Sequence, residues 1–142
     1  MSLKGPIISV EDDEDDQYLI KDVLRELGVS NEVLFFSHGK EALDYLLTTP
    51  EQPFLILCDV NMPMMNGLEL HSQIFHSEFL RRKAIPFVFL TTAANKKLVN
   101  EAYEQSVQGF YQKASSFEGF KRQLQYIIEY WKGCMHPNSF SY

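Results

Sequence analysis

Five short apolar runs, separated by segments with helical periodicity, constrain the fold of this chain more than any other feature. The runs are residues 6–10, 32–37, 54–58, 86–90 and 109–112. Apolar runs of this length, bounded by residues that break regular structure, are typical of strands buried on both faces. Between the runs, apolar residues recur three and four positions apart, the spacing of one helix face. In the first such segment they are Ile20, Val23, Leu24 and Leu27.

Strands that alternate with helices predict a parallel sheet covered on both faces, because right-handed crossover connections place helices on either side. We therefore predict an α/β fold: a single doubly wound, five-stranded parallel sheet in the order 2-1-3-4-5 with five helices, a flavodoxin-like arrangement. The domain is expected over residues 6–132. Residues 1–5 are expected to be an N-terminal extension, with a candidate cloning remnant at its start, and residues 133–142 a C-terminal tail.

The excess negative charge lies in one segment, residues 11–16, where every residue is acidic. The chain has 19 acidic and 13 basic residues, so the remainder holds 13 of each and is formally neutral. Charge concentrated in this way requires a bound cation or solvation. No basic stripe is present to meet a phosphate backbone, so a nucleic-acid partner is not expected.

The apolar runs and the cysteines indicate the compartment. No run approaches the roughly 20 residues that span a bilayer, and the first residues lack the layout of a secretory signal. A membrane partner is therefore not expected. The two cysteines, Cys58 and Cys134, have no metal-site spacing and fit a reducing compartment. We expect a cytoplasmic protein.

Polar residues with useful chemistry follow four of the five predicted strands. Glu11 and Asp12 follow the first run, Asp59 the third, Thr91 the fourth and Lys113 the fifth. In an open α/β sheet, ligands bind beyond the carboxyl ends of the strands, where the winding reverses. The sequence therefore predicts that these side chains meet at one edge of the sheet.

The residue types indicate phosphoryl chemistry at that edge. Carboxylates as close as Glu11, Asp12 and Asp59 would repel one another without a hard divalent cation, and oxygen ligands favour Mg²⁺ over zinc. With Mg²⁺ as cofactor, the Asp59 carboxylate is suited to attack a phosphorus atom. Lys113 would offset charge on the phosphoryl oxygens, and Thr91 would donate a hydrogen bond to them.

From residue 6 to about residue 131, the sequence resembles the receiver domain of two-component response regulators. The resemblance rests on four motifs in order: Ile-Ile-Ser-Val-Glu-Asp-Asp at 7–13, Leu-Cys-Asp-Val-Asn-Met-Pro at 57–63 with Asn66-Gly67 behind it, Pro-Phe-Val-Phe-Leu-Thr at 86–91, and Gly-Phe-Tyr-Gln-Lys at 109–113. Each motif is weak alone, and the ordered set is specific. The last helical segment also resembles that of single-domain receivers paired with phytochrome-like kinases.

The resemblance implies a signalling switch that phosphorylates and dephosphorylates itself, rather than a conventional enzyme. Asp59 would be the phosphoacceptor and would ligate Mg²⁺, together with Asp12 directly, Glu11 through water and Asn61 through its backbone carbonyl. The phosphoryl donor would be a sensor histidine kinase or a histidine phosphotransfer protein. The sequence does not name the downstream protein partner.

The resemblance also assigns a phosphate-binding pair and a switch pair. Thr91 and Lys113 would hold the phosphoryl oxygens. Thr91 would move toward the phosphate while the aromatic ring of Phe110 turns inward, which reshapes the face where partners dock.

Three residues depart from the pattern of the family. Ala114 stands where a proline after a cis bond is usual, so either that bond persists in this chain or the Lys113 loop is reshaped. Phe110 replaces the commoner tyrosine and lacks its hydroxyl, so movement of the ring could be sensed by a partner only through packing. Thr92 occupies a position that is usually small, and it is an alternative to Thr91 as the phosphate contact.

Plainer interpretations and other functions remain open from sequence alone. Residues 13–16 are expected to be a solvated helix start, Lys113 could be a surface lysine, and the four histidines are expected at the surface or in loops. A receiver-shaped scaffold that no longer cycles phosphate is the main alternative function. An aspartyl phosphatase is disfavoured because Asn61 stands where such enzymes carry a second, proton-donating aspartate.

Overall fold

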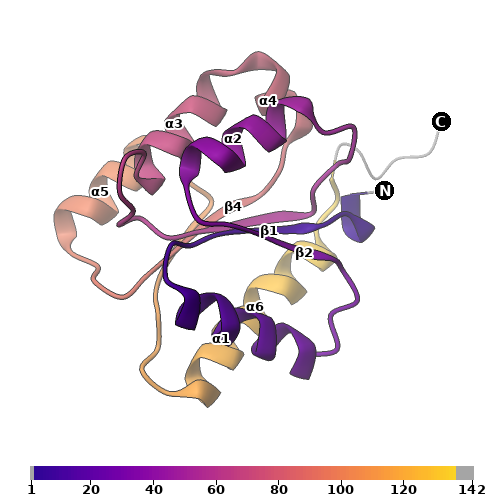
Figure 1. The fold of residues 1–142 in the computed structure, drawn as a ribbon, viewed down its shortest axis with the longest axis vertical. Coiled ribbons are helices and arrows are strands. Elements are labelled where there is room, and N and C mark those ends of the chain that lie inside the picture. The colour runs from indigo at the N-terminus through magenta and orange to yellow at the C-terminus, as the bar shows by residue number, and fades with distance from the viewer. Residues whose placement is uncertain (1, 137–142) are drawn as a thin grey trace.

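The structure is a computed structural model that describes residues 2–136. Its centre is a five-stranded, all-parallel sheet in the order β2-β1-β3-β4-β5 (Figure 1). The strands are β1 (Ile7–Val10), β2 (Val33–Phe36), β3 (Leu55–Cys58), β4 (Phe87–Thr91) and β5 (Gly109–Gln112). The predicted fold class and strand order are confirmed.

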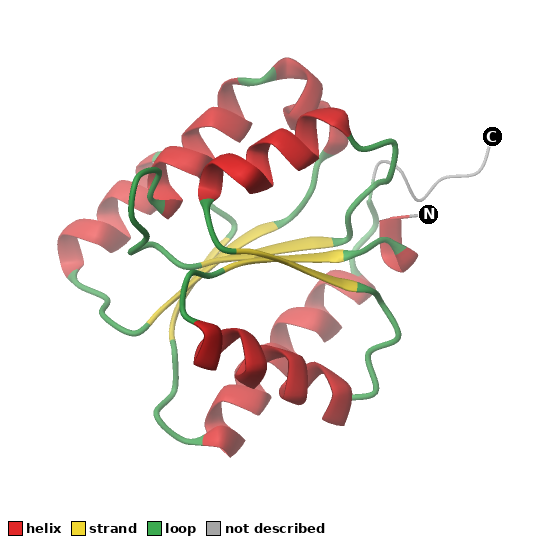
Figure 2. Cartoon of the chain, viewed as in Figure 1, coloured by secondary structure: helices red, strands yellow, loops and turns green. Residues whose placement is uncertain are grey.

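Helices cover both faces of the sheet (Figure 2). One face is covered by α1 (Glu14–Glu26) and α6 (Phe117–Gly133), and the other by α2 (Gly39–Thr48), α3 (Gly67–His76), α4 (Glu78–Lys83) and α5 (Lys96–Glu104). Successive strand residues point to opposite faces and build two separate cores. Ile7 and Leu57 pack toward α1 and α6, whereas Ile8 and Ile56 pack toward α2 and α3.

The described residues contain six α-helices rather than the predicted five. The extra helix arises at Ser77, which ends α3 and begins α4. The Ser77 hydroxyl accepts a hydrogen bond from the Leu80 backbone N–H at 3.2 Å, as an N-cap residue does. The apolar residues Leu70 and Ile74 predicted α3, but the polar sequence of α4 carries almost no periodic signal.

Both ends of the described chain pack against the domain. Residues Ser2–Lys4 form a short 3₁₀-helix, and the side-chain amide of Asn31 donates to the carbonyls of Leu3 and Gly5 at 3.0 and 2.8 Å. At the other end, α6 runs one residue into the expected tail. Met1 and residues 137–142 lie outside the described residues. Within residues 2–136, no helix has the length and apolar character needed to cross a membrane.

Two of the histidines that were expected at the surface or in loops are buried. His71 packs edge-on against Phe87, and its Nδ1 lies 3.2 Å from the Gln105 side-chain oxygen. Burial lowers the pKa of His71, so it serves as a neutral core residue. His136 packs near Phe54, and its Nε2 lies 2.8 Å from the Trp131 carbonyl oxygen. The prediction is wrong for His71, which is buried within α3 because aromatic side chains from β4 enclose its ring. His136 follows α6 in a loop, as the prediction allowed, although its ring is buried.

Candidate functional site

Three carboxylates meet at the carboxyl edge of the sheet. Glu11 and Asp12 follow β1 directly, and Asp59 follows β3, which pairs with β1. The Asp59 backbone N–H donates to the Val10 carbonyl at 3.0 Å, which extends the pairing to the site. Each of the three side chains offers an oxygen, and these oxygens lie within 4.8 Å of one another. The structure thus brings together the acids that the sequence placed at strand ends.

The segment after Asp59 is held close to the site. The Asn61 backbone N–H donates to the Asp59 carboxylate at 3.3 Å, so the Asn61 backbone lies beside the cluster. Gly67 begins α3 and approaches this segment so closely that a Cβ there would lie 2.3 Å from the Asp59 carbonyl oxygen. Only glycine permits that approach, which explains the Asn66-Gly67 pair in the motif.

Lys113 reaches the carboxylates from β5. Its ammonium lies 2.5 Å from the Glu11 carboxylate and 3.1 Å from that of Asp16, and its side chain is only 6% exposed. The bond to Ala114 is trans, since residues 2–136 contain no cis peptide bond. Of the two alternatives that Ala114 left open, the structure therefore has the reshaped loop. The lysine still lies in the site rather than on the surface.

The electrostatics of the site follow from its burial. Burial raises the pKa of Glu11 to about 7, and the charge of Asp59 adds to this, although the bond to Lys113 acts in the opposite direction. Burial alone would lower the pKa of Lys113, but Glu11, Asp59 and Asp16 together raise it above its ordinary value. One ammonium thus compensates the cluster only partly, and a cation among the carboxylates would be favoured.

The Glu11→Gln variant is expected to remove a pH dependence of stability in Mg²⁺-free buffer. Folded Glu11 keeps its proton up to about pH 7, whereas a glutamate in the unfolded chain releases it near its ordinary pKa of 4.5. The folded state therefore binds more protons in this window, and the contribution of Glu11 to the free energy of unfolding falls as pH rises. As pH rises from about 5 to about 8, the free energy of unfolding of the variant should increase relative to that of the parent by on the order of 1–3 kcal/mol.

Urea unfolding of both proteins in the presence of a chelator measures this difference. Comparison with the variant cancels the contributions of the other carboxylates. A stability difference that stays constant across the pH range would contradict the assigned environment of Glu11.

Thr91 and Phe110 lie in β4 and β5, the strands that follow β3 in the sheet. Thr91 is fully buried at the end of β4, and its hydroxyl accepts a hydrogen bond from the Ala93 backbone N–H at 3.3 Å. The Phe110 ring is partly buried, with its centroid 5.7 Å from that of Phe89. Thr92 is exposed. The placement is compatible with a switch pair and leaves Thr92 as the alternative contact.

Asp16 is a site residue that sequence reasoning missed. Residues 13–16 were predicted to be a solvated helix start, and Asp13 does cap α1, accepting bonds from the backbone N–H groups of Asp15 and Asp16. The Asp16 side chain, however, binds Lys113. The helix start turns this carboxylate back toward the strand ends, a direction that becomes clear only when α1 and β5 are placed together.

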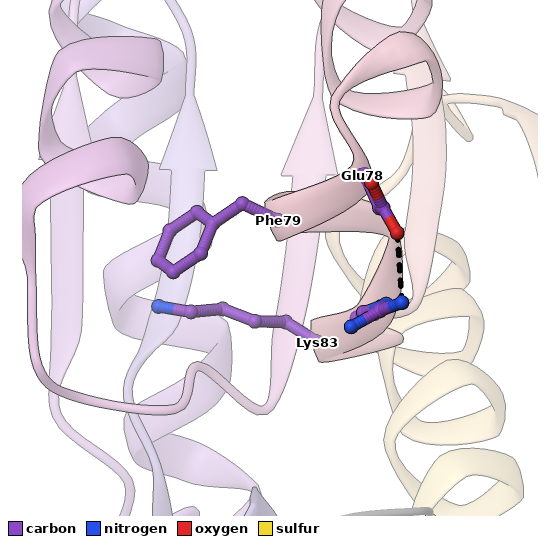
Figure 3. Close-up of a pocket in the computed structure, with 4 residues that line it drawn as sticks. Glu78, Phe79 and Lys83 are labelled. Carbon is purple, nitrogen blue, oxygen red and sulfur yellow. Dashed lines mark ion pairs between the residues drawn. The ribbon is translucent and has the colours of Figure 1, made fainter.

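A surface hollow lies against α4, away from the carboxylate cluster (Figure 3). It has a volume of about 490 Å³ and is lined by Glu78, Phe79, Arg82 and Lys83. Glu78 and Arg82 form an ion pair at 2.7 Å, and the Lys83 ammonium lies 4.8 Å from the centre of the Phe79 ring. None of the predicted site residues lines this hollow, so the candidate chemistry stays at the sheet edge.

Comparison with known proteins connects this sheet edge to a family. The response regulator receiver domain matches residues 7–125, a span that includes all the motifs and all the site residues described above. The chain belongs to this family. Receiver domains act in two-component signalling, and the predicted family is thereby confirmed.

Three relatives resemble this receiver domain over most of its length. The probable methanogenesis regulatory protein FilR2 of Methanothrix harundinacea (strain 6Ac) is 37% identical over 131 residues, covering 89% of this chain and 83% of FilR2. The phosphorylated cyanobacterial phytochrome response regulator RcpA has a TM-score of 0.84 and 30% identity, covering 93% of this chain and 97% of RcpA. The Mn²⁺-bound form of the response regulator Rcp1 has a TM-score of 0.81 and 29% identity, covering 93% and 98%.

The donor set of this receiver domain fits a hard divalent cation. The clustered side chains offer only oxygen atoms, and the described residues bring no histidine or thiol ligand into the cluster. Oxygen-only sites suit Mg²⁺ and Mn²⁺ better than zinc or copper. Burial, and then the charge of Asp59, raise the pKa of Glu11, and a cation beside the carboxylates would favour its ionised form.

Proposed function

We propose that residues 6–132 form a cytoplasmic phosphoacceptor switch, in which Asp59 takes a phosphoryl group from a sensor histidine kinase or a histidine phosphotransfer protein. The observation that carries the proposal is the convergence of three carboxylates within 4.8 Å, with the Lys113 ammonium 2.5 Å from Glu11. Membership of the receiver family supports it.

Each side chain has a distinct part in the proposed transfer. An Asp59 carboxylate oxygen attacks the phosphorus of the donor phosphohistidine, an oxygen–phosphorus bond forms, and the phosphorus–nitrogen bond breaks as the imidazole leaves. Bound Mg²⁺ would neutralise charge on the carboxylates and on the phosphoryl oxygens. Asp12, Asp59 and the Asn61 backbone carbonyl would hold the ion directly, and Glu11 through water.

Lys113 and Thr91 would each then take a phosphoryl oxygen as a new hydrogen-bond partner. Lys113 is held by Glu11 and Asp16, and it would turn its ammonium to a phosphoryl oxygen as charge develops there. The Thr91 hydroxyl would give up its contact with Ala93 and donate to another phosphoryl oxygen. These two changes link the chemistry at Asp59 to the ends of β4 and β5.

The proposed output is a change on the face formed by α5, β5 and α6. A groove on this face is lined by aromatic residues that include Tyr103, Phe110, Tyr130 and Trp131. Movement of Thr91 would leave space for the Phe110 ring to turn inward, and the groove would change shape. A downstream protein that binds this face would read the change, and because Phe110 has no hydroxyl the signal would be one of packing.

The direct test is incubation with a small phosphodonor such as acetyl phosphate in the presence of Mg²⁺. Intact-mass measurement is expected to show the gain of one phosphoryl group per chain, and a chelator should prevent the gain. The absence of any mass gain, with the folded state verified by circular dichroism, would count against the proposal.

A scaffold that binds partners without cycling phosphate is the second candidate. Its motivating observation is that Lys113 is already held by two carboxylates beside the unusual Ala114. Titration with Mg²⁺ and beryllofluoride, a phosphoryl mimic, separates the candidates. The switch requires amide shift changes at Thr91 and Phe110 when the mimic is added, whereas the scaffold would give none there.

A further inference from the structure

The backbone around Lys113 is held by three hydrogen bonds. The Lys113 backbone N–H donates to the Thr91 carbonyl at 2.8 Å and continues the pairing of β4 and β5. The peptide groups on either side of the lysine both bind the side-chain amide of Gln123. Its nitrogen donates to the Gln112 carbonyl at 2.8 Å, and its oxygen accepts from the Ala114 N–H at 3.0 Å.

This arrangement fixes the direction in which the lysine leaves the backbone. The Gln112 carbonyl belongs to the peptide before the Lys113 Cα, and the Ala114 N–H belongs to the peptide after it. A single amide that binds both peptides restrains the two soft dihedrals of Lys113 at once. An unpaired polar group at either position would instead be free to rotate toward water.

Gln123 belongs to a helix that packs into the core. It lies in α6, next to the fully buried Leu124, and Phe120 packs into the same core. The first turn of α6 also touches the loop directly, since a Cβ at Gly119 would lie 2.9 Å from the Ala114 Cβ. The amide therefore projects from a packed helix rather than from a second loop.

We propose that Gln123 is a positioning residue, which clamps the trans Lys113–Ala114 segment so that the lysine ammonium is held at the carboxylate cluster. The clamp supplies by hydrogen bonding the local rigidity that a proline after Lys113 would supply covalently. The restraint on the backbone does not depend on phosphoryl transfer, whereas the effect of Gln123 on the reaction rate rests on the proposed transfer to Asp59. Gln123 acts through Lys113 and need not touch the phosphoryl group.

The test compares Gln123→Met, which keeps the side-chain volume and loses both bonds, with Gln125→Met. Gln125 lies in the same helix, and its amide nitrogen donates to the exposed Glu129 carboxylate at 3.1 Å. In Gln123→Met, the backbone order parameters of Lys113 and Ala114 are expected to fall toward the values of a flexible loop. The rate of phosphorylation by acetyl phosphate should fall about tenfold, because the lysine is misplaced. Gln125→Met should leave both unchanged.

A double-variant cycle with Lys113→Met shows whether the effect passes through the lysine. If it does, Gln123→Met causes no further loss of rate when Lys113 is already replaced. An equal loss in both backgrounds would overturn the proposal, as would unchanged order parameters in Gln123→Met. Gln123→Glu, which keeps the acceptor for Ala114, should fall between the parent and Gln123→Met.

The order parameters also separate this proposal from the proposed function. If the parent protein takes up no phosphoryl group, phosphoryl transfer is refuted, and loss of order in Gln123→Met would still support the clamp. If the parent is phosphorylated and Gln123→Met keeps both its order and its rate, the clamp is refuted while the switch stands.

Discussion

The Asp59→Asn variant is expected to gain no phosphoryl group under conditions that fully phosphorylate the parent. The amide that replaces the carboxylate has no anionic oxygen, so it cannot act as the nucleophile in the transfer. The change preserves the size of the side chain, and the backbone N–H of Asp59 keeps its bond to the Val10 carbonyl. Intact-mass measurement after incubation with acetyl phosphate and Mg²⁺ measures the effect.

Asp44→Asn is the matched control for this loss. Asp44 is an exposed aspartate on α2 that pairs with Lys40 at 2.9 Å, and its carboxylate is not one of the three in the cluster. The control is expected to take up the phosphoryl group as the parent does. A mass gain in Asp59→Asn equal to that of the parent would mean that another residue is the acceptor.

The Asp12→Ala variant is expected to lose at least about tenfold in Mg²⁺ affinity, because direct ligands contribute no less than the outer residues whose loss costs about 10- to 100-fold. Asp12 supplies one of the three clustered carboxylates and is exposed, so its removal leaves no buried group unpaired. Isothermal titration calorimetry at constant pH and ionic strength gives the affinity directly.

Asp15→Ala distinguishes ligation from general charge. Asp15 belongs to the same acidic run and carries the same charge, but its carboxylate is not part of the cluster. At physiological ionic strength salt screens exposed charges, so this control, which removes no ligand, should bind Mg²⁺ nearly as the parent does. Equal losses in the two variants would indicate a diffuse acidic surface and no defined ion site.

The sheet and its polar edge were predictable because both depend on local pattern. Each strand lies within a mainly apolar run, and the residue that follows it necessarily lies at the carboxyl edge of a parallel sheet. Asp59 could therefore be placed beside Glu11 without knowledge of any long-range contact. The pairing of Val10 with Cys58 brings these residues together as the winding rule requires.

The residues that sequence reasoning missed all depend on side-chain direction. Asp16 could equally have faced solvent, and only its contact with Lys113, which follows β5, shows that it faces the site. Gln123 lies ten residues beyond Lys113 in a helix whose polar positions look alike. Its two hydrogen bonds form because the loop between β5 and α6 folds back along the helix. The periodicity of the sequence does not predict the path of this loop.

The most direct test of the account is a crystal structure with Mg²⁺ and beryllofluoride bound. We expect one ion ligated by Asp12 and Asp59, the beryllofluoride on the Asp59 carboxylate, and the Lys113 ammonium moved from Glu11 to a fluorine atom of the mimic. An ion bound away from these aspartates, or a mimic that never attaches to Asp59, would contradict it.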